Sequence, residues 1–207
     1  MRRGLRKAVR SSTAVERSSA ALLLIDVIND LEFPGGEKLA RFVLPMARRL
    51  ARLKQRARAS RVPAIYVNDN FGRWRSDFRK LVARCLDEGA RGREMVRLLE
   101  PDDEDYFVLK TKHSCFYATS LEALLRQIGA TTLVLGGVAG DICVLFTAND
   151  AYLRDYRVLV PADCVASETG EENRRALAVM RRILAVRTAP SARVRFDRLG
   201  RTARAGG

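Results

Sequence analysis

The sequence predicts an α/β protein in which a mostly parallel sheet of about six strands is covered by helices on both faces. Two observations lead to this fold class. Short, almost continuous apolar runs, typical of strands buried on both faces, alternate along the chain with segments of helical periodicity. The 207 residues, 47% hydrophobic and 30% charged, fit one large domain and exclude a disordered or collagen-like chain.

Five apolar segments are predicted to be strands. The first, Ala20–Ile25, contains only apolar residues and is followed by Asp26. A sixth strand is expected at 185–187. The five segments lie at 20–25, 62–67, 106–109, 132–135 and 157–160.

Apolar residues at helical spacing predict five helices between and after these strands. Pro45 is expected to kink or restart the first helix. Thr119 or Ser120 is expected to cap the third helix, and Gly129 to close it. Residues 101–105 form a polar connector. The helices are expected at about 39–53, 81–86, 121–128, 142–154 and 171–184.

The formal net charge of +14 is concentrated at the two ends of the chain. Residues 1–20 carry six basic residues against one acidic residue, and residues 181–207 carry eight arginines against Asp197. We therefore divide the chain into a basic N-terminal arm (1–19), a folded domain (20–190) and a basic C-terminal tail (191–207). Basic arms attract nucleic acid. No aromatic residue interleaves with the first arm as a base-stacking platform requires, so a nucleic-acid partner is not expected.

Membrane insertion and disulfide bonding are not expected either. No apolar run approaches the ~20 residues that a membrane-spanning helix needs. The four cysteines show no CxxC spacing, which indicates reduced thiols and a cytoplasmic location. The single histidine, His113, cannot support a zinc cluster.

Three reactive side chains follow predicted strands. Asp26 comes after the first strand, Lys110 after the third and Cys143 shortly after the fourth. Because ligands of open α/β sheets bind outside the carboxyl ends of the strands, we expect these side chains to share one site. Each has a structural explanation when taken alone, but their joint position favours a functional one.

The segments around these three residues resemble those of the isochorismatase-like cysteine hydrolases. The resemblance covers about 20–187 and implies a three-layer α/β/α fold, a Cys143–Asp26–Lys110 triad with Lys110 rather than Lys112 as its lysine, and self-association into a homo-oligomer. It rests on Leu24–Asp30, Val108–Phe116, Gly136–Val144 and Thr147–Ala151.

The resemblance also implies an oxyanion site built from the backbone N–H groups of Ala139 and Cys143. The second donor would be turned inward by a cis peptide bond between Val138 and Ala139. Between Leu135 and Cys143 there is no Asn, Gln, Ser or Tyr that could donate a hydrogen bond from its side chain.

The triad residues can account for the cleavage of an amide. A thiol with a pKa near 8.5 is mostly protonated at neutral pH, and a helix N-terminus would favour the thiolate of Cys143. Asp26 can accept the thiol proton while Lys110 holds Asp26 in place. The thiolate attacks a carbonyl, and water then hydrolyses the thioester. We therefore expect a cofactor-independent cysteine hydrolase of an amide or related C–N bond in a small molecule.

A metal-dependent reaction is not expected. Nicotinamidases, one branch of the family, carry an aspartate and several histidines as metal ligands after the second strand. Residues 68–78 of this chain contain no histidine, so we expect neither a metal-dependent nicotinamidase nor a bound metal.

The substrate pocket is expected to have apolar walls and few polar anchors. Asn70 and Arg73 are candidate anchors, and His113, three residues after Lys110, is a candidate substrate contact. The candidate walls are Phe33, Phe71, Trp74, Phe116 and Phe146.

Two other functions of the candidate site remain open at this point, and a nucleic-acid binder that uses the basic ends is a third alternative. In an isochorismatase-type reaction, Asp26 would protonate a vinyl ether and Cys143 would be dispensable. A non-catalytic binding or scaffold protein could also keep the fold, although it has no need of a lysine paired with Asp26.

Overall fold

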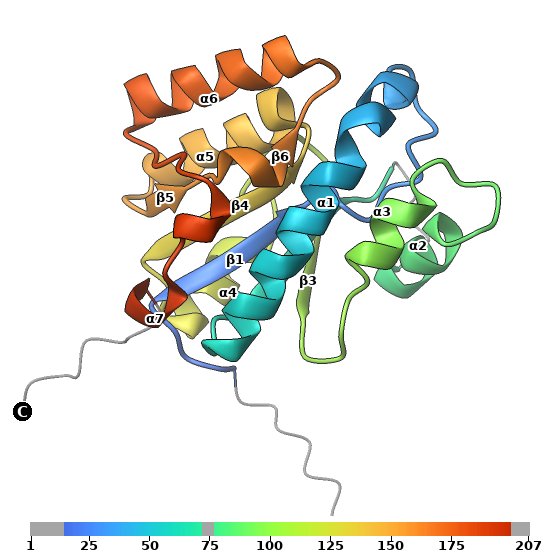
Figure 1. Ribbon diagram of the computed structural model, residues 1–207. Coiled ribbons are helices and arrows are strands. Elements are labelled where there is room, and N and C mark those ends of the chain that lie inside the picture. The colour runs from blue at the N-terminus through green and yellow to red at the C-terminus, as the bar shows by residue number, and fades with distance from the viewer. Residues whose placement is uncertain (1–14, 72–76, 200–207) are drawn as a thin grey trace, which may run out of the picture.

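A parallel sheet forms the centre of the computed structural model, which describes residues 15–71 and 77–199 (Figure 1). The strand order is β3-β2-β1-β4-β5, β6 pairs with the end of β4, and all these pairings are parallel. The strands are β1 (Ala20–Ile25), β2 (Ala64–Asp69), β3 (Tyr106–Lys110), β4 (Thr132–Val138), β5 (Arg157–Leu159) and β6 (Val165–Ala166).

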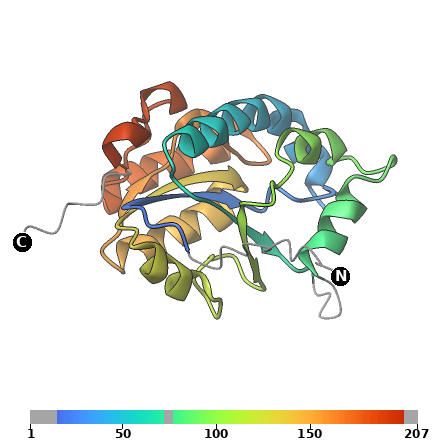
Figure 2. The ribbon, with the colours of Figure 1, turned by 90° about the horizontal axis from the view of Figure 1, so that it is seen from below.

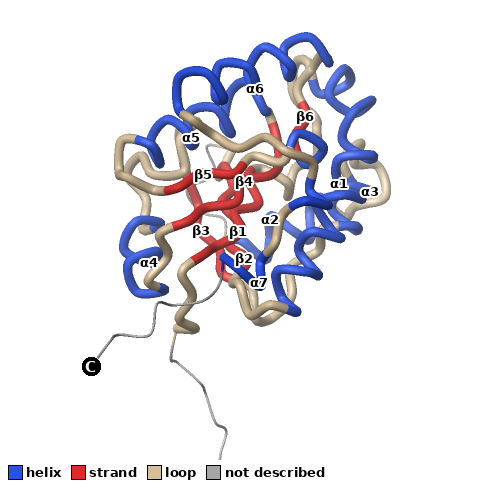
Figure 3. Tube along the Cα trace, turned by 60° about the vertical axis from the view of Figure 1, so that its left-hand side comes forward, coloured by secondary structure: helices blue, strands red, loops and turns tan. Residues whose placement is uncertain are grey.

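Helices cover both faces of the sheet, so the predicted three-layer α/β/α fold is confirmed (Figures 2 and 3). Helices α1, α2, α3 and α7 contribute to the hydrophobic core on one face, and α4, α5 and α6 to the core on the other. The helices are α1 (Gly36–Ala59), α2 (Phe78–Cys85), α3 (Arg93–Leu98), α4 (Leu121–Ile128), α5 (Leu145–Tyr152), α6 (Gly170–Leu184) and α7 (Phe196–Leu199). Among the described residues, no helix has the length and hydropathy to cross a membrane.

Strand β1 shows why the sequence places a strand between two layers. Leu22 and Leu24 point into the core beneath α1, whereas Leu23 and Ile25 point into the core beneath α4 to α6. Successive side chains of a strand point to opposite faces, so a strand buried on both faces must be apolar at every position. All six residues of β1 are fully buried.

Gly137 allows the end of β4 to lie close against β1. Its φ angle is 128°, and a Cβ atom there would lie 2.0 Å from the carbonyl oxygen of Ile25. A residue with a side chain fits neither this backbone conformation nor this space. This close approach brings the segment after β4, which carries Cys143, next to Asp26, which follows β1.

Two predicted elements differ from the structure. The sixth strand is Val165–Ala166, not 185–187, where Arg187 forms only an isolated bridge with Leu159. The first helix runs through Pro45 from residue 36 to residue 59. Pro45 and Arg41, whose carbonyl loses its helical partner, both lie on the exposed face of α1, where water can reach the carbonyl.

The predicted C-terminal tail begins too early. Residues 191–199 pack against the α1 side of the core, and Val194 and Phe196 are 3% and 2% exposed. Arg56 of α1 donates a hydrogen bond to the carbonyl of Ser191 at 2.9 Å, and Ser191 contacts Asp163 through its backbone N–H and its hydroxyl. At the other end of the chain, Ser18 is buried and its N–H donates to the carbonyl of Ile128.

Candidate active site

The three candidate catalytic residues lie at the carboxyl edge of the sheet. Asp26 directly follows β1, and its N–H donates to the carbonyl of Val67 at 3.0 Å. Lys110 is the last residue of β3. Cys143 lies in a π-helical segment, Gly140–Val144, that follows β4 and leads into α5. Parallel strands bring residues far apart in the sequence to one edge.

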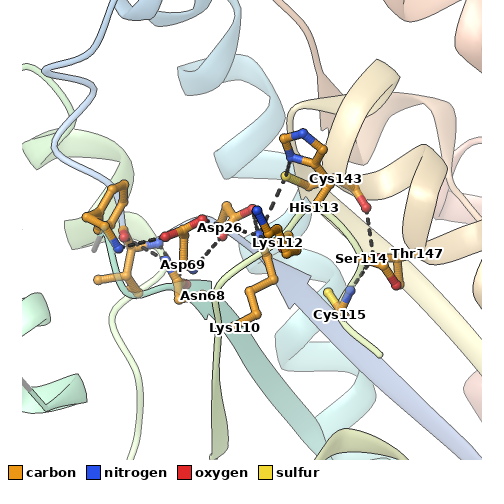
Figure 4. A network of polar contacts seen from close by, with 12 residues as sticks. Asp26, Asn68, Asp69, Lys110, Lys112, His113, Ser114, Cys115, Cys143 and Thr147 are labelled. Carbon is orange, nitrogen blue, oxygen red and sulfur yellow. Dashed lines mark hydrogen bonds and ion pairs between the residues drawn. The ribbon is translucent and has the colours of Figure 1, made fainter. Parts of the chain in front are cut away.

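The Lys110 ammonium group connects the other two residues (Figure 4). Its Nζ lies 2.8 Å from Oδ2 of Asp26 and 3.6 Å from Sγ of Cys143. Nζ also donates to the carbonyl of Lys112 at 3.1 Å. The side chains of Lys110 and Asp26 are 0% and 7% exposed, whereas Cys143 is partly exposed. A partly exposed cysteine thus lies next to a buried ion pair.

Burial and neighbouring charges together shift the pKa values of all three groups. It raises the pKa of Asp26 above its ordinary value, against the opposing effect of Lys110. Burial and the charge of Asp26 raise the pKa of the Cys143 thiol. Burial alone would lower the pKa of Lys110, but Asp26 and Cys143 outweigh it and the pKa is raised. The pKa of the Cys143 thiol thus lies above its ordinary value, because burial and the neighbouring carboxylate both disfavour the thiolate.

Helix α5 connects the loop that follows Lys110 with the segment that carries Cys143. The N–H of Cys115 donates to Oγ1 of Thr147 at 3.1 Å, and that hydroxyl donates to the carbonyl of Cys143 at 2.7 Å. One turn further along, Ser114 donates a hydrogen bond to Asp150. These contacts position Lys110 and Cys143 relative to one another.

The loop before Cys143 has the expected backbone. The peptide bond between Val138 and Ala139 is cis, as predicted. The carbonyl of Ala139 accepts hydrogen bonds from the N–H groups of Ile142 and Val144. The role of the Ala139 and Cys143 N–H groups as oxyanion donors stays a prediction.

Two of the predicted substrate contacts lie beside the sulfur. Nδ1 of His113 is 4.0 Å from Sγ of Cys143, and the His113 ring lies 5.5 Å from the ring of Phe146. Both side chains are exposed. His113, from the loop after β3, and Phe146, from α5, therefore meet on the accessible side of the thiol.

The other predicted contacts are more scattered. Phe33 is 36% exposed in the loop before α1, and Phe71 packs partly buried against the α1 side of the core. The N–H of Asn70 donates to the carbonyl of Lys110 at 3.0 Å. Arg73 and Trp74 lie outside the described residues.

Phe116 does not line a pocket as predicted. It is 5% exposed, and its ring contacts Tyr156 and the guanidinium group of Arg154 in the core beneath α4 to α6. Phe116 comes shortly after Lys110 in the sequence, but its ring belongs to this core and not to the site. We therefore assign Phe116 to the core.

Asp69 is a site residue that the sequence interpretation missed. Its backbone N–H donates to Oδ1 of Asp26 at 2.7 Å, and its own Oδ2 lies 3.9 Å from Nζ of Lys110. The second strand predicted from the sequence ends at Val67, which places Asp69 in a loop. Strand β2 in fact continues to Asp69 and lies between β1 and β3. The strand order, which places the end of β2 between Asp26 and Lys110, is the signal that would have identified Asp69.

Metal ligands do not gather in the part of the chain that the structure describes. Within residues 15–71 and 77–199, no group of three or more His, Cys, Asp or Glu side chains could hold a metal ion.

Comparison with known proteins defines the class. The family model described as "Isochorismatase domain" matches residues 20–191. This chain is an isochorismatase-family hydrolase. It is 41% identical over 170 residues, 82% of this chain and 93% of the relative, to an uncharacterized isochorismatase family protein of Bacillus subtilis, YaaI.

Two further relatives are named as an amidohydrolase and an amidase. The chain is 29% identical over 188 residues, 79% of this chain and 73% of the relative, to ureidoacrylate amidohydrolase RutB of Methylobacterium radiotolerans. The solved structure of N-carbamoylsarcosine amidase from Thermoplasma acidophilum is similar with a TM-score of 0.63 and 27% identity, covering 85% of this chain and 98% of that one.

Proposed function

We propose that this protein hydrolyses an amide or ureide C–N bond of a small molecule through a thioester on Cys143. The observation that carries the proposal is the position of the Lys110 ammonium group, 2.8 Å from the Asp26 carboxylate and 3.6 Å from the Cys143 sulfur. The names of the amidohydrolase and amidase relatives support the same class of bond.

The raised pKa of Cys143 makes a base necessary in the first step. Asp26 accepts the thiol proton as the sulfur forms a bond to the carbonyl carbon, giving a tetrahedral oxyanion. Asp26 then returns the proton to the leaving nitrogen as the C–N bond breaks. A raised pKa suits Asp26 to both tasks, because it makes the carboxylate a stronger base and the protonated carboxyl group easier to form.

A second cycle of proton transfer releases the acid. Asp26 removes a proton from water, the water oxygen attacks the thioester carbon, and the C–S bond breaks with return of the proton to sulfur. Lys110 stays protonated throughout, because its raised pKa keeps the ammonium form. It positions Asp26 and offsets the negative charge that passes between Asp26 and Cys143.

The substrate is proposed to lie against His113 and Phe146. Both side chains are exposed beside the sulfur, and their rings lie 5.5 Å apart. A small planar acyl group bound to the sulfur would lie against these two rings. Asn70 and Phe71 follow β2, Phe33 lies in the loop before α1, and these are the remaining candidates for substrate contact among the described residues.

A panel of primary amides and ureides, assayed by release of ammonia or amine, tests the function. We expect turnover by the wild-type chain and a loss on the order of 10⁴-fold or more in Cys143→Ala. Cys164→Ala, which removes a buried thiol from the core on the α1 face of the sheet, is the matched control and should remain active, because Cys143 packs against the core on the other face. Hydroxylamine should trap the acyl group of the wild-type intermediate as a hydroxamate.

Two results would contradict the proposal. Turnover that persists in Cys143→Ala would move the chemistry to Asp26, as in vinyl-ether cleavage. No turnover of any amide or ureide by a folded wild-type chain would favour a binding protein with this fold.

A further inference from the structure

The carboxylate of Asp69 is the accessible acidic group of the site. Its side chain is 35% exposed, compared with 7% for Asp26 and 0% for Lys110. Oδ2 lies 3.9 Å from Nζ of Lys110, and Nζ lies 3.6 Å from the Cys143 sulfur. Because both atoms are placed relative to Nζ, Oδ2 of Asp69 lies no farther from Sγ of Cys143 than these two distances added together. In Figure 4, Asp69 lies on the opposite side of Asp26 from Cys143 and His113.

The site carries a local negative charge because of this residue. Lys110 is paired with Asp26 at 2.8 Å, so the positive charge at the site is already offset by the buried carboxylate. Among the described residues, the one ion pair of Asp69 is the longer contact with the same ammonium group. A group that enters beside Lys110 thus meets a carboxylate whose charge is only partly offset.

Asp69 has hydrogen-bonding capacity left for a ligand. Oδ1 accepts the N–H of Phe71 at 2.6 Å, which fixes the orientation of the carboxylate. An ionised carboxylate has about four acceptor positions and no donor. The remaining positions suit an N–H group and repel an acid.

We propose that Asp69 determines the substrate class: its carboxylate accepts an N–H group of a neutral or cationic amide or ureide and excludes substrates with an acidic group next to the scissile carbonyl. This inference rests on the proposed function, because it takes the sulfur of Cys143 as the attacking atom. Asp69 therefore differs in role from Asp26. Asp26 transfers protons, whereas Asp69 selects what is bound.

Alkylation of Cys143 by two matched reagents tests the inference without a known substrate. Iodoacetamide is neutral and carries an amide N–H₂ group, whereas iodoacetate has a carboxylate in its place. In both reactions the thiolate forms a C–S bond and displaces iodide. The ratio of the two rate constants is independent of the pKa of Cys143, because both reagents react with the same thiolate. The rates are measured by peptide mapping, with a chelator present, and the reference ratio comes from a short cysteine peptide.

We expect the wild-type ratio, iodoacetamide over iodoacetate, to exceed that of the peptide by roughly 3- to 50-fold, the range for two unit charges about 7 Å apart in a partly solvated site. The net charge of +14 acts in the other direction, since it attracts the anion. Asp69→Asn should bring the ratio to within about twofold of the peptide. It keeps an acceptor for the Phe71 N–H, and the backbone N–H to Asp26 is unaffected by the substitution.

Asp103→Asn is the matched control. It changes the net charge equally, but Asp103 is exposed in the connector that precedes β3, at the end of that strand opposite Lys110. Its ratio should equal that of the wild type. A wild-type ratio equal to that of the peptide, or a wild-type ratio kept in Asp69→Asn, would overturn the inference.

Failure of this inference and failure of the proposed function give different results. The alkylation ratio requires an accessible thiol and no turnover, so it can be measured even if the amide panel is negative. Where the panel identifies a substrate, Asp69→Asn should raise KM with little change in kcat, because the lost contact is made equally in the bound and transition states. A fall in kcat at unchanged KM would contradict a role in selection.

Discussion

Lys110 has more contacts in the site than either of its triad partners, although it takes no part in bond making. Its ammonium group is fully buried and reaches Asp26, Cys143, Asp69 and the carbonyl of Lys112. A buried lysine is retained in the charged form only where such partners compensate for lost hydration. We therefore expect that removal of the ammonium group mainly changes the pKa of Asp26 and leaves the fold in place.

The pH profile of Lys110→Met provides the measurement. Asp26 acts as a base only when ionised, so kcat/KM should rise with pH through the pKa of Asp26. Loss of the ammonium group removes the effect that opposes burial, which raises this pKa further. The rising limb should therefore move to higher pH in Lys110→Met.

Lys112→Met serves as the control for this experiment, because Lys112 is exposed and its side chain belongs to no ion pair among the described residues. Its profile should match that of the wild type. An unshifted limb in Lys110→Met would mean that the limb reports a group other than Asp26.

At the scale of the elements, the end of β4 near the site has a tight steric requirement. In Gly137→Ala, the new Cβ would meet the carbonyl oxygen of Ile25 at 2.0 Å, and the φ of 128° is unfavourable for alanine. Overpacking typically costs about 1–3 kcal/mol, so we expect a loss of unfolding free energy of at least about 2 kcal/mol once the backbone strain is added.

Urea denaturation measures this loss. Gly89→Ala is the matched control, because a Cβ there has no neighbour within 4 Å. Its stability should stay within about 0.5 kcal/mol of the wild type. Equal midpoints for the two variants would show that the β1–β4 contact can relax without cost.

The main elements of the sheet were predictable from sequence because each central strand is apolar on both faces. The exceptions have physical causes. Strand β6 has only two residues, too few to form an apolar run, and α3 has only six, too few to show helical periodicity. The segment 185–187 begins at Ala185, which ends α6 with a φ of 51°, and it contributes one bridge to β5.

The candidate site was predictable to the extent that its residues end strands. Asp26, Lys110 and Cys143 each follow or end an apolar run, and the structure brings them together. Asp69 was missed because polar residues at 68 and 69 resemble the start of a loop. Phe116 was misplaced because aromatic residues serve cores and pockets alike, and the sequence does not give the direction of a ring.

At the scale of the whole molecule, the described C-terminal segment completes the core rather than extending beyond it. Val194 and Phe196 are buried, whereas Arg193 and Arg195 are exposed. The high arginine content of this segment suggested a tail, although its buried and exposed residues alternate. The homo-oligomer implied by the family resemblance stays a prediction.

Truncation of one buried ring tests this packing. Phe196→Ala should lower the unfolding free energy by about 3–5 kcal/mol, because it removes a buried aromatic ring from the α1 side of the core. Arg195→Ala removes an exposed side chain and a surface ion pair with Asp197, and should change stability by no more than about 1 kcal/mol. A thermal or urea transition in Phe196→Ala that matches the wild type would restore the interpretation of residues 191–199 as a tail.

The contact between Ser19 and Leu199 places both ends of the described chain at one edge of the sheet. The Ser19 hydroxyl donates to the Leu199 carbonyl, so the start of β1 and the end of α7 meet at the amino edge of the sheet (Figure 1). Asp26, Lys110 and Cys143 lie at the carboxyl edge, a strand length away. A chain anchored to a bead, a surface or a fusion partner beyond Ser19 or Leu199 would therefore present its thiol to the solution, which makes either end suitable for immobilising the enzyme with its reactive edge outward.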